Sequence, residues 1–146
     1  NLKFKVHDNC IFDKNYENYF DLILSNPPFF FTDKVLKSKN ISINNSKYIS
    51  ELDLEKWLNN IILYLKAKGT AFIINRFENI DFMLEILKKF NLEVTTTPIL
   101  SFKGSKPKNV LLKITKSDYF IEKTSNAIII HDKLSKYSKD IVNWFK

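Results

Sequence analysis

Phe20-Asp21-Leu22-Ile23-Leu24-Ser25-Asn26-Pro27-Pro28-Phe29 is the most informative stretch of the sequence. Its first five residues form a short apolar run, which is typical of a strand buried on both faces. The run stops at Ser25-Asn26, and the two prolines that follow can neither donate to a sheet ladder nor continue a helix. The stretch therefore predicts a strand followed by a rigid turn.

Further strands and helices are predicted on both sides of this strand. Leu2 to Val6 alternates apolar with polar residues, which indicates an earlier strand. Ser50 is a candidate N-cap with Asp53 at the third helical position, and Gly69 is the expected stop of that helix. The other predicted segments are strands over 71–74, 92–98 and 109–115, a helix that Asn79 caps, an apolar run over 127–130, and a short helix from Tyr137 to Phe145.

The two longer helices each have one apolar stripe. In the first the stripe consists of Leu52, Leu54, Trp57, Leu58, Ile61, Ile62 and Leu65, and in the second of Ile80, Met83, Leu84, Ile86, Leu87 and Phe90. Strands that alternate with such helices favour a mostly parallel sheet covered by helices, as in half of a doubly wound α/β domain. Gly104 and Pro107 lie between the strands at 92–98 and 109–115, so these two strands are expected to form an antiparallel hairpin with a basic loop.

The composition limits the class of protein. The chain has 146 residues, of which 45% are hydrophobic, so it can bury one core. No apolar run approaches the roughly 18 residues needed to cross a bilayer, and charges interrupt residues 1–20, so neither a membrane span nor a secretory leader is expected. A strand is predicted directly after Asn1, so the chain is expected to begin inside a fold.

Cysteine, histidine and glycine are rare in the sequence. Cys10 is the single cysteine, with only His7 and His131 as histidines, so neither an internal disulfide nor a structural zinc site is expected. A reducing, cytoplasmic setting is the simpler interpretation, with Cys10 as an inert buried thiol. Gly69 and Gly104 are the two glycines, which excludes a Gly-rich phosphate or dinucleotide loop from this sequence.

The formal net charge of +7 suits a polyanionic partner such as nucleic acid, although a lysine-rich soluble protein has the same balance. Residues 32–50 have no clear period and are expected to form a long loop or a lid. The candidate phosphate contacts are Lys34, Lys37, Lys39 and Lys47 in this loop, and Lys103, Lys106 and Lys108 in the hairpin loop. A solvated lysine surface is the alternative interpretation of both groups.

The turn after the strand at 20–24 presents groups that can hold a flat base. An amino group on an aromatic ring is a poor nucleophile, and it needs acceptors for its two hydrogens. Asn26 Oδ1 and the Pro27 carbonyl are both acceptors, Pro28 fixes the turn, and Phe29 can stack on the base. An ordinary strand end with a rigid turn is the alternative.

Asn26-Pro27-Pro28-Phe29 after a buried strand resembles the catalytic motif of S-adenosylmethionine-dependent methyltransferases that act on exocyclic or amide nitrogens. Segments 20–30, 52–57, 106–112 and 137–145 resemble the bacterial tRNA1(Val) (adenine-N6)-methyltransferases. The chain is therefore expected to be the C-terminal part of a Rossmann-like methyltransferase domain, with a mostly parallel sheet closed by an antiparallel hairpin. It departs from its relatives at 46–49 and at Asn109, where an arginine is common.

The resemblance implies methyl transfer from S-adenosylmethionine to N6 of the adenosine next to the anticodon of a tRNA, with no metal. It implies that Asn26 and Pro27 orient the nucleophile, and that Asp8, Asn9 and Asn26 contact the cofactor. The family's Gly-rich turn and the acidic residue for the ribose are not in the sequence, so residues 1–146 are expected to be one incomplete domain that needs its N-terminal half for activity. Residues 119–146 are expected to be a C-terminal extension packed on the same domain.

Other functions stay open at this point. The same fold acts on guanine N2 of ribosomal RNA or on a protein glutamine amide, and a non-catalytic remnant or RNA-binding fragment is a further alternative. Trp57 and the pair His131-Asp132 have simpler, structural interpretations. Trp57 is expected in the core because it lies on a helix stripe, and His131-Asp132 is expected to form a turn rather than an acid/base pair.

Overall fold

The computed structural model describes residues 14–28, 30–31, 48–132 and 136–144. Its main sheet has the strand order β1 (Phe20–Ser25), β4 (Leu65–Arg76), β6 (Asn109–Lys116), β5 (Leu92–Phe102) and β7 (Ile121–Thr124), and β8 (Ile128–His131) also pairs with β5. β1 is parallel to β4, and β7 and β8 are parallel to β5, whereas β6 is antiparallel to both of its neighbours. The predicted mostly parallel sheet with one antiparallel hairpin is confirmed.

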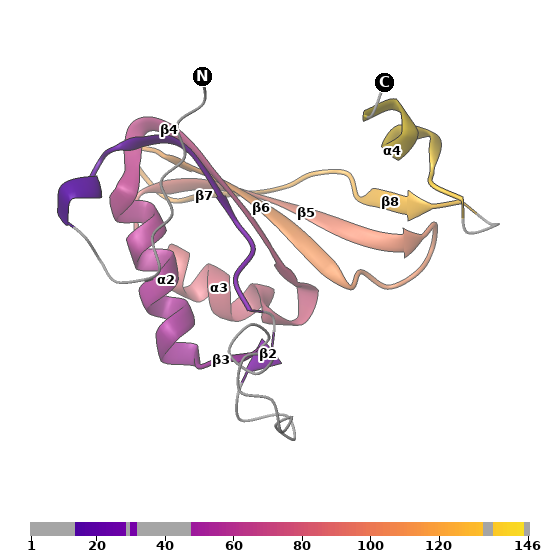
Figure 1. Ribbon diagram of the computed structural model, residues 1–146, viewed down its shortest axis with the longest axis horizontal. Coiled ribbons are helices and arrows are strands. Elements are labelled where there is room, and N and C mark those ends of the chain that lie inside the picture. The colour runs from indigo at the N-terminus through magenta and orange to yellow at the C-terminus, as the bar shows by residue number, and fades with distance from the viewer. Residues whose placement is uncertain (1–13, 29, 32–47, 133–135, 145–146) are drawn as a thin grey trace.

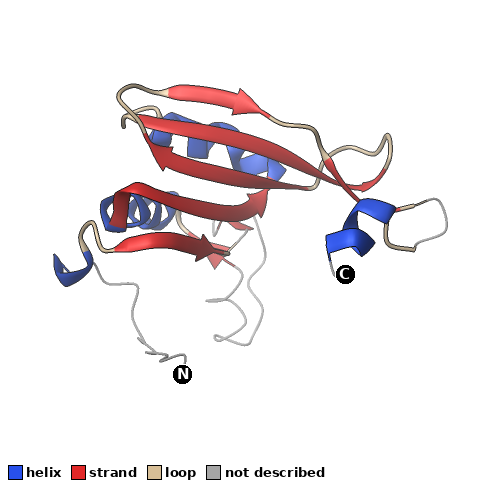
Figure 2. Ribbon diagram, turned by 90° about the horizontal axis from the view of Figure 1, so that it is seen from above, coloured by secondary structure: helices blue, strands red, loops and turns tan. Residues whose placement is uncertain are grey.

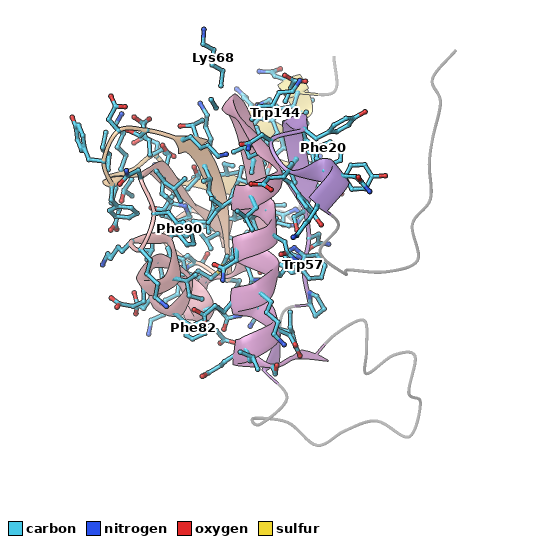
Figure 3. The ribbon with its side chains drawn as sticks, turned by 90° about the vertical axis from the view of Figure 1, so that its left-hand side faces the viewer. Phe20, Trp57, Lys68, Phe82, Phe90 and Trp144 are labelled. Carbon is cyan, nitrogen blue, oxygen red and sulfur yellow. The ribbon has the colours of Figure 1, made fainter. Side chains whose placement is uncertain are left out.

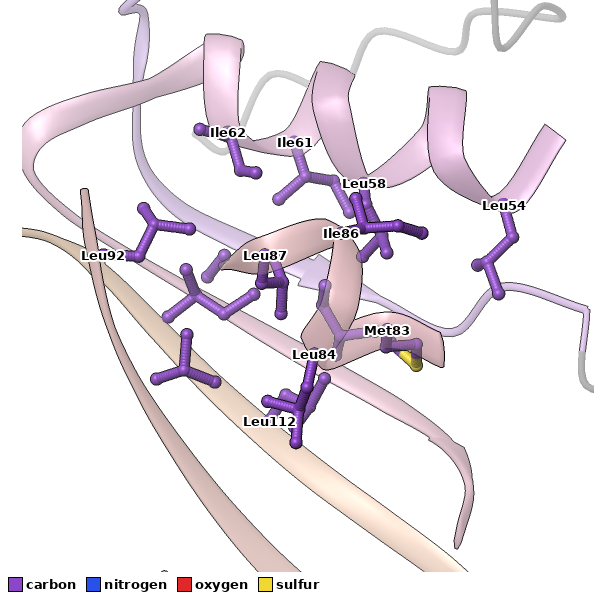
Figure 4. Close-up of a cluster of buried hydrophobic side chains, with 14 of the residues drawn as sticks. Leu54, Leu58, Ile61, Ile62, Met83, Leu84, Ile86, Leu87, Leu92 and Leu112 are labelled. Carbon is purple, nitrogen blue, oxygen red and sulfur yellow. The ribbon is translucent and has the colours of Figure 1, made fainter. Parts of the chain in front are cut away.

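Two helices cover one face of this sheet. Figures 1 and 2 show α2 (Glu51–Tyr64) and α3 (Ile80–Leu87) on the same side of the strands. The alternate residues of the central strands that face the helices, such as Ile73, Val94 and Leu112, are fully buried. Figure 4 shows the apolar stripe of α2 packed against that of α3 above these strands. This packing is the core, and it confirms both predicted stripes except at Leu52, which is exposed.

Ser50 is the N-cap of α2, as predicted. The Asp53 amide donates to Ser50 Oγ over 3.0 Å, and the Ser50 hydroxyl donates to the Asp53 carboxylate over 2.6 Å. The predicted stop at Gly69 is wrong, because α2 ends at Tyr64 and Leu65 already belongs to β4. Gly69 lies inside β4, where an added Cβ would come within 2.8 Å of the Phe20 carbonyl oxygen. A close approach of two strands, rather than a helix end, requires glycine there.

The prediction that the first described strand is buried on both faces is also wrong. Leu24 is 73% exposed, because β1 pairs with β4 alone among the described residues and the helices cover only one of its faces. Contacts with the other described residues therefore do not bury all of the apolar side chains of β1. Leu2 to Val6 and Cys10 lie outside the described residues, so the first predicted strand and the buried thiol stay predictions.

Several shorter elements differ from the sequence-based prediction. α3 ends at Leu87, and Phe90 packs against the core from the turn that follows. The Asn79 side chain makes no capping bond to α3 and instead donates to Asn75 Oδ1 over 2.8 Å. The C-terminal helix α4 spans Lys139–Trp144, since Tyr137 forms a β-bridge with His131. Elements that the periodicity did not predict are η1 (Lys14–Tyr16), β2 (Phe30–Phe31), β3 (Tyr48–Ile49), η3 (Phe77–Asn79) and β7.

Candidate functional site

The Asn-Pro-Pro turn lies at the carboxyl edge of the sheet. Ser25, the last residue of β1, is paired with Ile73, and the parallel strand β4 continues from there to Arg76. Asn26 directly after β1 is exposed, Pro27 is buried, and Pro28 is half-buried. Ligands of open α/β sheets bind beyond this edge, so the one polar side chain of the turn is presented where a ligand can reach it.

A hydrogen bond between β1 and α2 anchors the strand end just before Asn26. Trp57 Nε1 donates to Ser25 Oγ over 2.9 Å, and the indole ring, labelled beside α2 in Figure 3, packs against the core. The prediction of Trp57 as a core residue is confirmed. Its polar partner was not predicted, because Ser25 and Trp57 are far apart in the sequence and no local pattern relates them.

The end of β4 ties the basic hairpin loop to the same edge of the sheet. The buried Asn75 Oδ1 accepts bonds from the Asn79 side chain and from the Arg76 amide, at 2.8 and 2.7 Å. The next residue, Phe77, donates its amide hydrogen to the Lys108 carbonyl over 2.9 Å. The base of the hairpin loop is therefore held against the turn that follows β4, and Lys108 lies at this edge with an exposed side chain.

The three predicted lysines of the hairpin loop are exposed, and they lie at different distances from the sheet. Lys108 lies at the base of the hairpin loop, where its amide donates to the Ile99 carbonyl. Lys103 and Lys106 lie farther out, in the loop beyond Phe102. The other predicted site residues lie outside the described residues; these are Asp8, Asn9, Phe29, Lys34, Lys37, Lys39 and Lys47. The structure therefore places Asn26, Pro27, Pro28 and Lys108 at one edge.

The described residues contain one part of the predicted cofactor site. Asn26 has a side chain that can accept or donate hydrogen bonds at the carboxyl edge, which fits a contact to an amino group or an adenosine. A hollow of about 340 Å³ lies elsewhere, between β8 and α4, and is lined by residues 127–129, Asn143 and Trp144. Strands β4, β6 and β5 separate it from β1, so it is not part of this site.

Two kinds of feature are absent from the described part of the chain. No three His, Cys, Asp or Glu side chains are grouped there so that they could hold a metal ion. No helix there is both long and apolar enough to cross a membrane. The predicted turn at His131-Asp132 is wrong for His131, which is the last residue of β8, and the Asp132 amide after it donates to the Lys136 carbonyl over 2.8 Å.

Comparison with solved structures assigns the fold. The chain superposes on a predicted O-methyltransferase from Agrobacterium tumefaciens with a TM-score of 0.61 over 87% of this chain and 51% of that one, at 15% identity. The chain has the Rossmann-like fold of a methyltransferase. The low identity carries no information about the substrate.

Comparison of sequences finds one curated relative. The chain is 30% identical over 112 residues to the tRNA1(Val) (adenine(37)-N6)-methyltransferase of Phocaeicola vulgatus. The match covers 76% of this chain and 46% of the relative, so the chain spans about half the length of that protein. No family model matches the sequence. The chain is thus similar to a methyltransferase in fold and to part of another in sequence.

Proposed function

We propose that this methyltransferase-like chain orients the nucleophile in S-adenosylmethionine-dependent methylation of adenine N6 in tRNA. The observation that carries the proposal is the exposed Asn26 at the carboxyl edge of β1, between a buried proline and a strand end bonded to Trp57. The likeness to a curated tRNA (adenine-N6)-methyltransferase supports the choice of substrate, and so does the net charge of +7.

The chemistry that we propose for the turn is orientation of an amino group. Asn26 Oδ1 and the Pro27 carbonyl accept the two hydrogens of the adenine amino group, which aims the nitrogen lone pair at the methyl donor. S-Adenosylmethionine, when bound, supplies the methyl group as an electrophile. A nitrogen–carbon bond forms as the carbon–sulfur bond breaks, and the nitrogen then loses one proton.

The remaining residues of the predicted site complete the proposal. Phe29 stacks on the target base, and Asp8 and Asn9 contact the cofactor. We propose that Lys37, Lys39 and Lys47, together with Lys103, Lys106 and Lys108, contact RNA phosphates. Phosphate contacts of this kind position an RNA without reading its sequence, so they do not by themselves select one tRNA.

The test measures cofactor binding and methyl transfer separately. The complete product of the gene that encodes this chain is titrated with S-adenosylmethionine by calorimetry and then assayed with methyl-labelled cofactor on unmodified tRNA. We expect Asn26→Ala to reduce kcat by about a hundredfold or more, as loss of a positioned hydrogen-bonding group commonly does. Asn126→Ala, an exposed asparagine between β7 and β8, is the matched control and is expected to keep full activity.

Three results would contradict the proposal. One is full methyl transfer by Asn26→Ala, and another is a gene product that neither binds the cofactor nor methylates tRNA. Methylation of ribosomal RNA or of a protein glutamine in place of tRNA would keep the reaction class and replace the substrate. The chain of residues 1–146 alone is expected to be inactive in the same assay.

A further inference from the structure

Three ring side chains form a row across neighbouring chain segments beyond the hairpin. Phe102 at the end of β5 is the cross-strand partner of His131 at the end of β8, and His131 is the bridge partner of Tyr137. The ring centroids of Phe102 and His131 are 5.6 Å apart, and those of His131 and Tyr137 are 5.4 Å apart with the planes 20° from parallel. Cross-strand partners point to the same face of a sheet, so the three rings form one continuous surface.

This row of Phe102, His131 and Tyr137 is accessible to a ligand. Tyr137 is 62% exposed and Phe102 is 40% exposed, although the contact with His131 already covers part of each ring. Figure 1 shows β8 and the ends of β5 and β6 extending away from α2 and α3. The core therefore does not use these rings, and their outer faces are open to further stacking.

Lysines lie close in the chain to two of the three rings of the aromatic row. Lys103 follows Phe102 in the chain, Lys136 precedes Tyr137, and Lys106 lies in the same hairpin loop as Lys103. All three side chains are exposed, and none of them forms an ion pair with another residue in the described ranges. Of the residues next to the three rings in the chain, Lys103 and Lys136 are basic and Asp132 is acidic, and Asp140 lies three residues after Tyr137.

We propose that the row of Phe102, His131 and Tyr137 is a stacking site for an unpaired base of single-stranded RNA. Aromatic rings in a row, with exposed lysines close by in the chain, match the two parts of a nucleotide, since every base has a flat face and every linkage has a phosphate. An acidic protein segment would use the lysines but would leave the rings unused. The proposal rests on the proposed function in one respect, namely that the substrate is an RNA.

The site is separate from the Asn-Pro-Pro turn. Strands β4 and β6 lie between β1 and β5, so a base on the aromatic row cannot be the base held at Asn26. The row would therefore hold a second nucleotide, one that flanks the methylated base or lies elsewhere on the same RNA. Such a contact adds affinity for unpaired segments over duplex, because the bases of a duplex are already stacked on each other.

The test is RNA binding in the absence of the methyl donor. A labelled oligoadenylate of about ten nucleotides, within the usual site size of single-strand binders, is titrated with the complete gene product and followed by fluorescence anisotropy. We expect Tyr137→Ala to weaken binding by about fivefold or more, which corresponds to about 1 kcal/mol of lost stacking. Tyr137→Phe keeps the ring and is expected to bind as the unaltered protein does. Tyr119→Ala removes an exposed tyrosine outside the row and is expected to have no effect.

Photocrosslinking to the unaltered protein locates the bound RNA without a variant that could misfold. The same oligonucleotide with 4-thiouridine at one position is photocrosslinked to the unaltered protein, and the crosslinks are expected at Phe102 or Tyr137. Equal binding by Tyr137→Ala, crosslinks elsewhere, or equal affinity for a duplex of the same length would overturn the proposal. Tyr137-dependent binding of polyglutamate without RNA binding would identify a protein docking surface instead and would also overturn it.

The outcomes separate this site from the proposed function. Tyr137-dependent RNA binding by a protein that does not methylate tRNA would leave the stacking site in place and remove the proposed activity. Conversely, Asn26-dependent methylation with no effect of Tyr137→Ala on RNA affinity would leave the activity in place and remove the stacking site.

Discussion

Ser25 and Trp57 are the residues through which the core controls the position of Asn26. The strand end before Asn26 has no further partner strand among the described residues, so the 2.9 Å bond from the indole fixes it to α2. A bond of this kind between partly buried groups typically contributes about 1 kcal/mol to stability. We expect Trp57→Phe to lower the free energy of unfolding by about that amount, measured by urea denaturation.

A double-mutant cycle assigns the effect to the bond itself. If Ser25→Ala and Trp57→Phe act through one hydrogen bond, the double variant loses less stability than the two single losses added together. Trp144→Phe makes the same change at an exposed tryptophan and is expected to leave stability unchanged. Strict additivity of Ser25→Ala and Trp57→Phe would show that the bond does not couple β1 to α2.

The two glycines allow a prediction that separates crowding from backbone strain. An added Cβ at Gly69 meets the Phe20 carbonyl and Leu65 Cδ1, each at 2.8 Å, whereas one at Gly104 meets nothing within 4 Å. Gly104 has a φ of 83°, which asparagine tolerates better than alanine does. We expect Gly69→Ala to destabilise the protein by about 1–3 kcal/mol and Gly69→Asn to destabilise it more.

The order of the two substitutions is expected to reverse at Gly104. There Gly104→Ala is expected to be the worse of the pair, by up to about 1 kcal/mol, because only the backbone conformation is at issue. Thermal unfolding of the four variants measures both orders. The same order at both positions would refute the distinction between a crowded strand and a strained turn.

The local part of the site could be predicted at the scale of residues, and the non-local part could not. Asn26 and Pro27 follow an apolar run, and that order is sufficient to place them at the end of a strand. The partner of Ser25 lies across the core on α2, and the partner of Lys108 lies on the turn after β4. These contacts depend on how the elements pack, which periodicity does not specify.

At the scale of elements, α2 is stabilised mainly by the stripe that it buries. Leu54 and Leu58 are fully buried against α3 and the sheet, whereas Leu52 is 60% exposed in the same helix. We expect Leu58→Ala to destabilise the protein by about 2–5 kcal/mol through a cavity in the core. Leu52→Ala makes the same chemical change and is expected to shift stability by no more than about 0.5 kcal/mol. Urea denaturation of the two variants checks this, and similar losses would contradict the packing of α2.

Two elements were predicted wrongly or missed, namely the end of α2 and the strand β7, and each has its own cause. Glycine is typical of helix ends, so Gly69 was the expected stop, but α2 ends at Tyr64 because β4 begins at Leu65. β7 is short and has only Ile121 on its apolar side, so alternation could not identify it as a strand. Its pairing with Glu93–Thr96 of β5 supplies the stability that its own sequence lacks.

At the scale of the whole molecule, the packed core and the proposed site lie in different places. The helices cover one face, while the Asn-Pro-Pro turn and the base of the hairpin loop lie at the carboxyl edge of the strands. β7 and β8 both pair with β5, which supports our proposal that residues 119–146 are an extension packed on the same domain. Three of the proposed RNA contacts, Lys103, Lys106 and Lys108, lie between β5 and β6, and β5 is the strand with which this extension pairs.

The position of positive charge, and not its amount, is expected to determine RNA affinity. Lys106 and Lys108 lie in the hairpin loop, whose base bonds to the residue after the end of β4. Lys14 precedes β1, and Lys68 lies near the start of β4. The slope of log affinity against log salt is negative. Its magnitude falls by about 0.7 for each phosphate of a single strand that the protein no longer neutralises. We expect the pair Lys106→Ala and Lys108→Ala to lower that magnitude by about 1.4, and the pair Lys14→Ala and Lys68→Ala to leave it unchanged. Anisotropy titrations of both double variants over a range of salt concentrations measure the slopes. Equal reductions would mean that RNA responds to the net charge of +7 alone, and that the hairpin loop is a solvated surface.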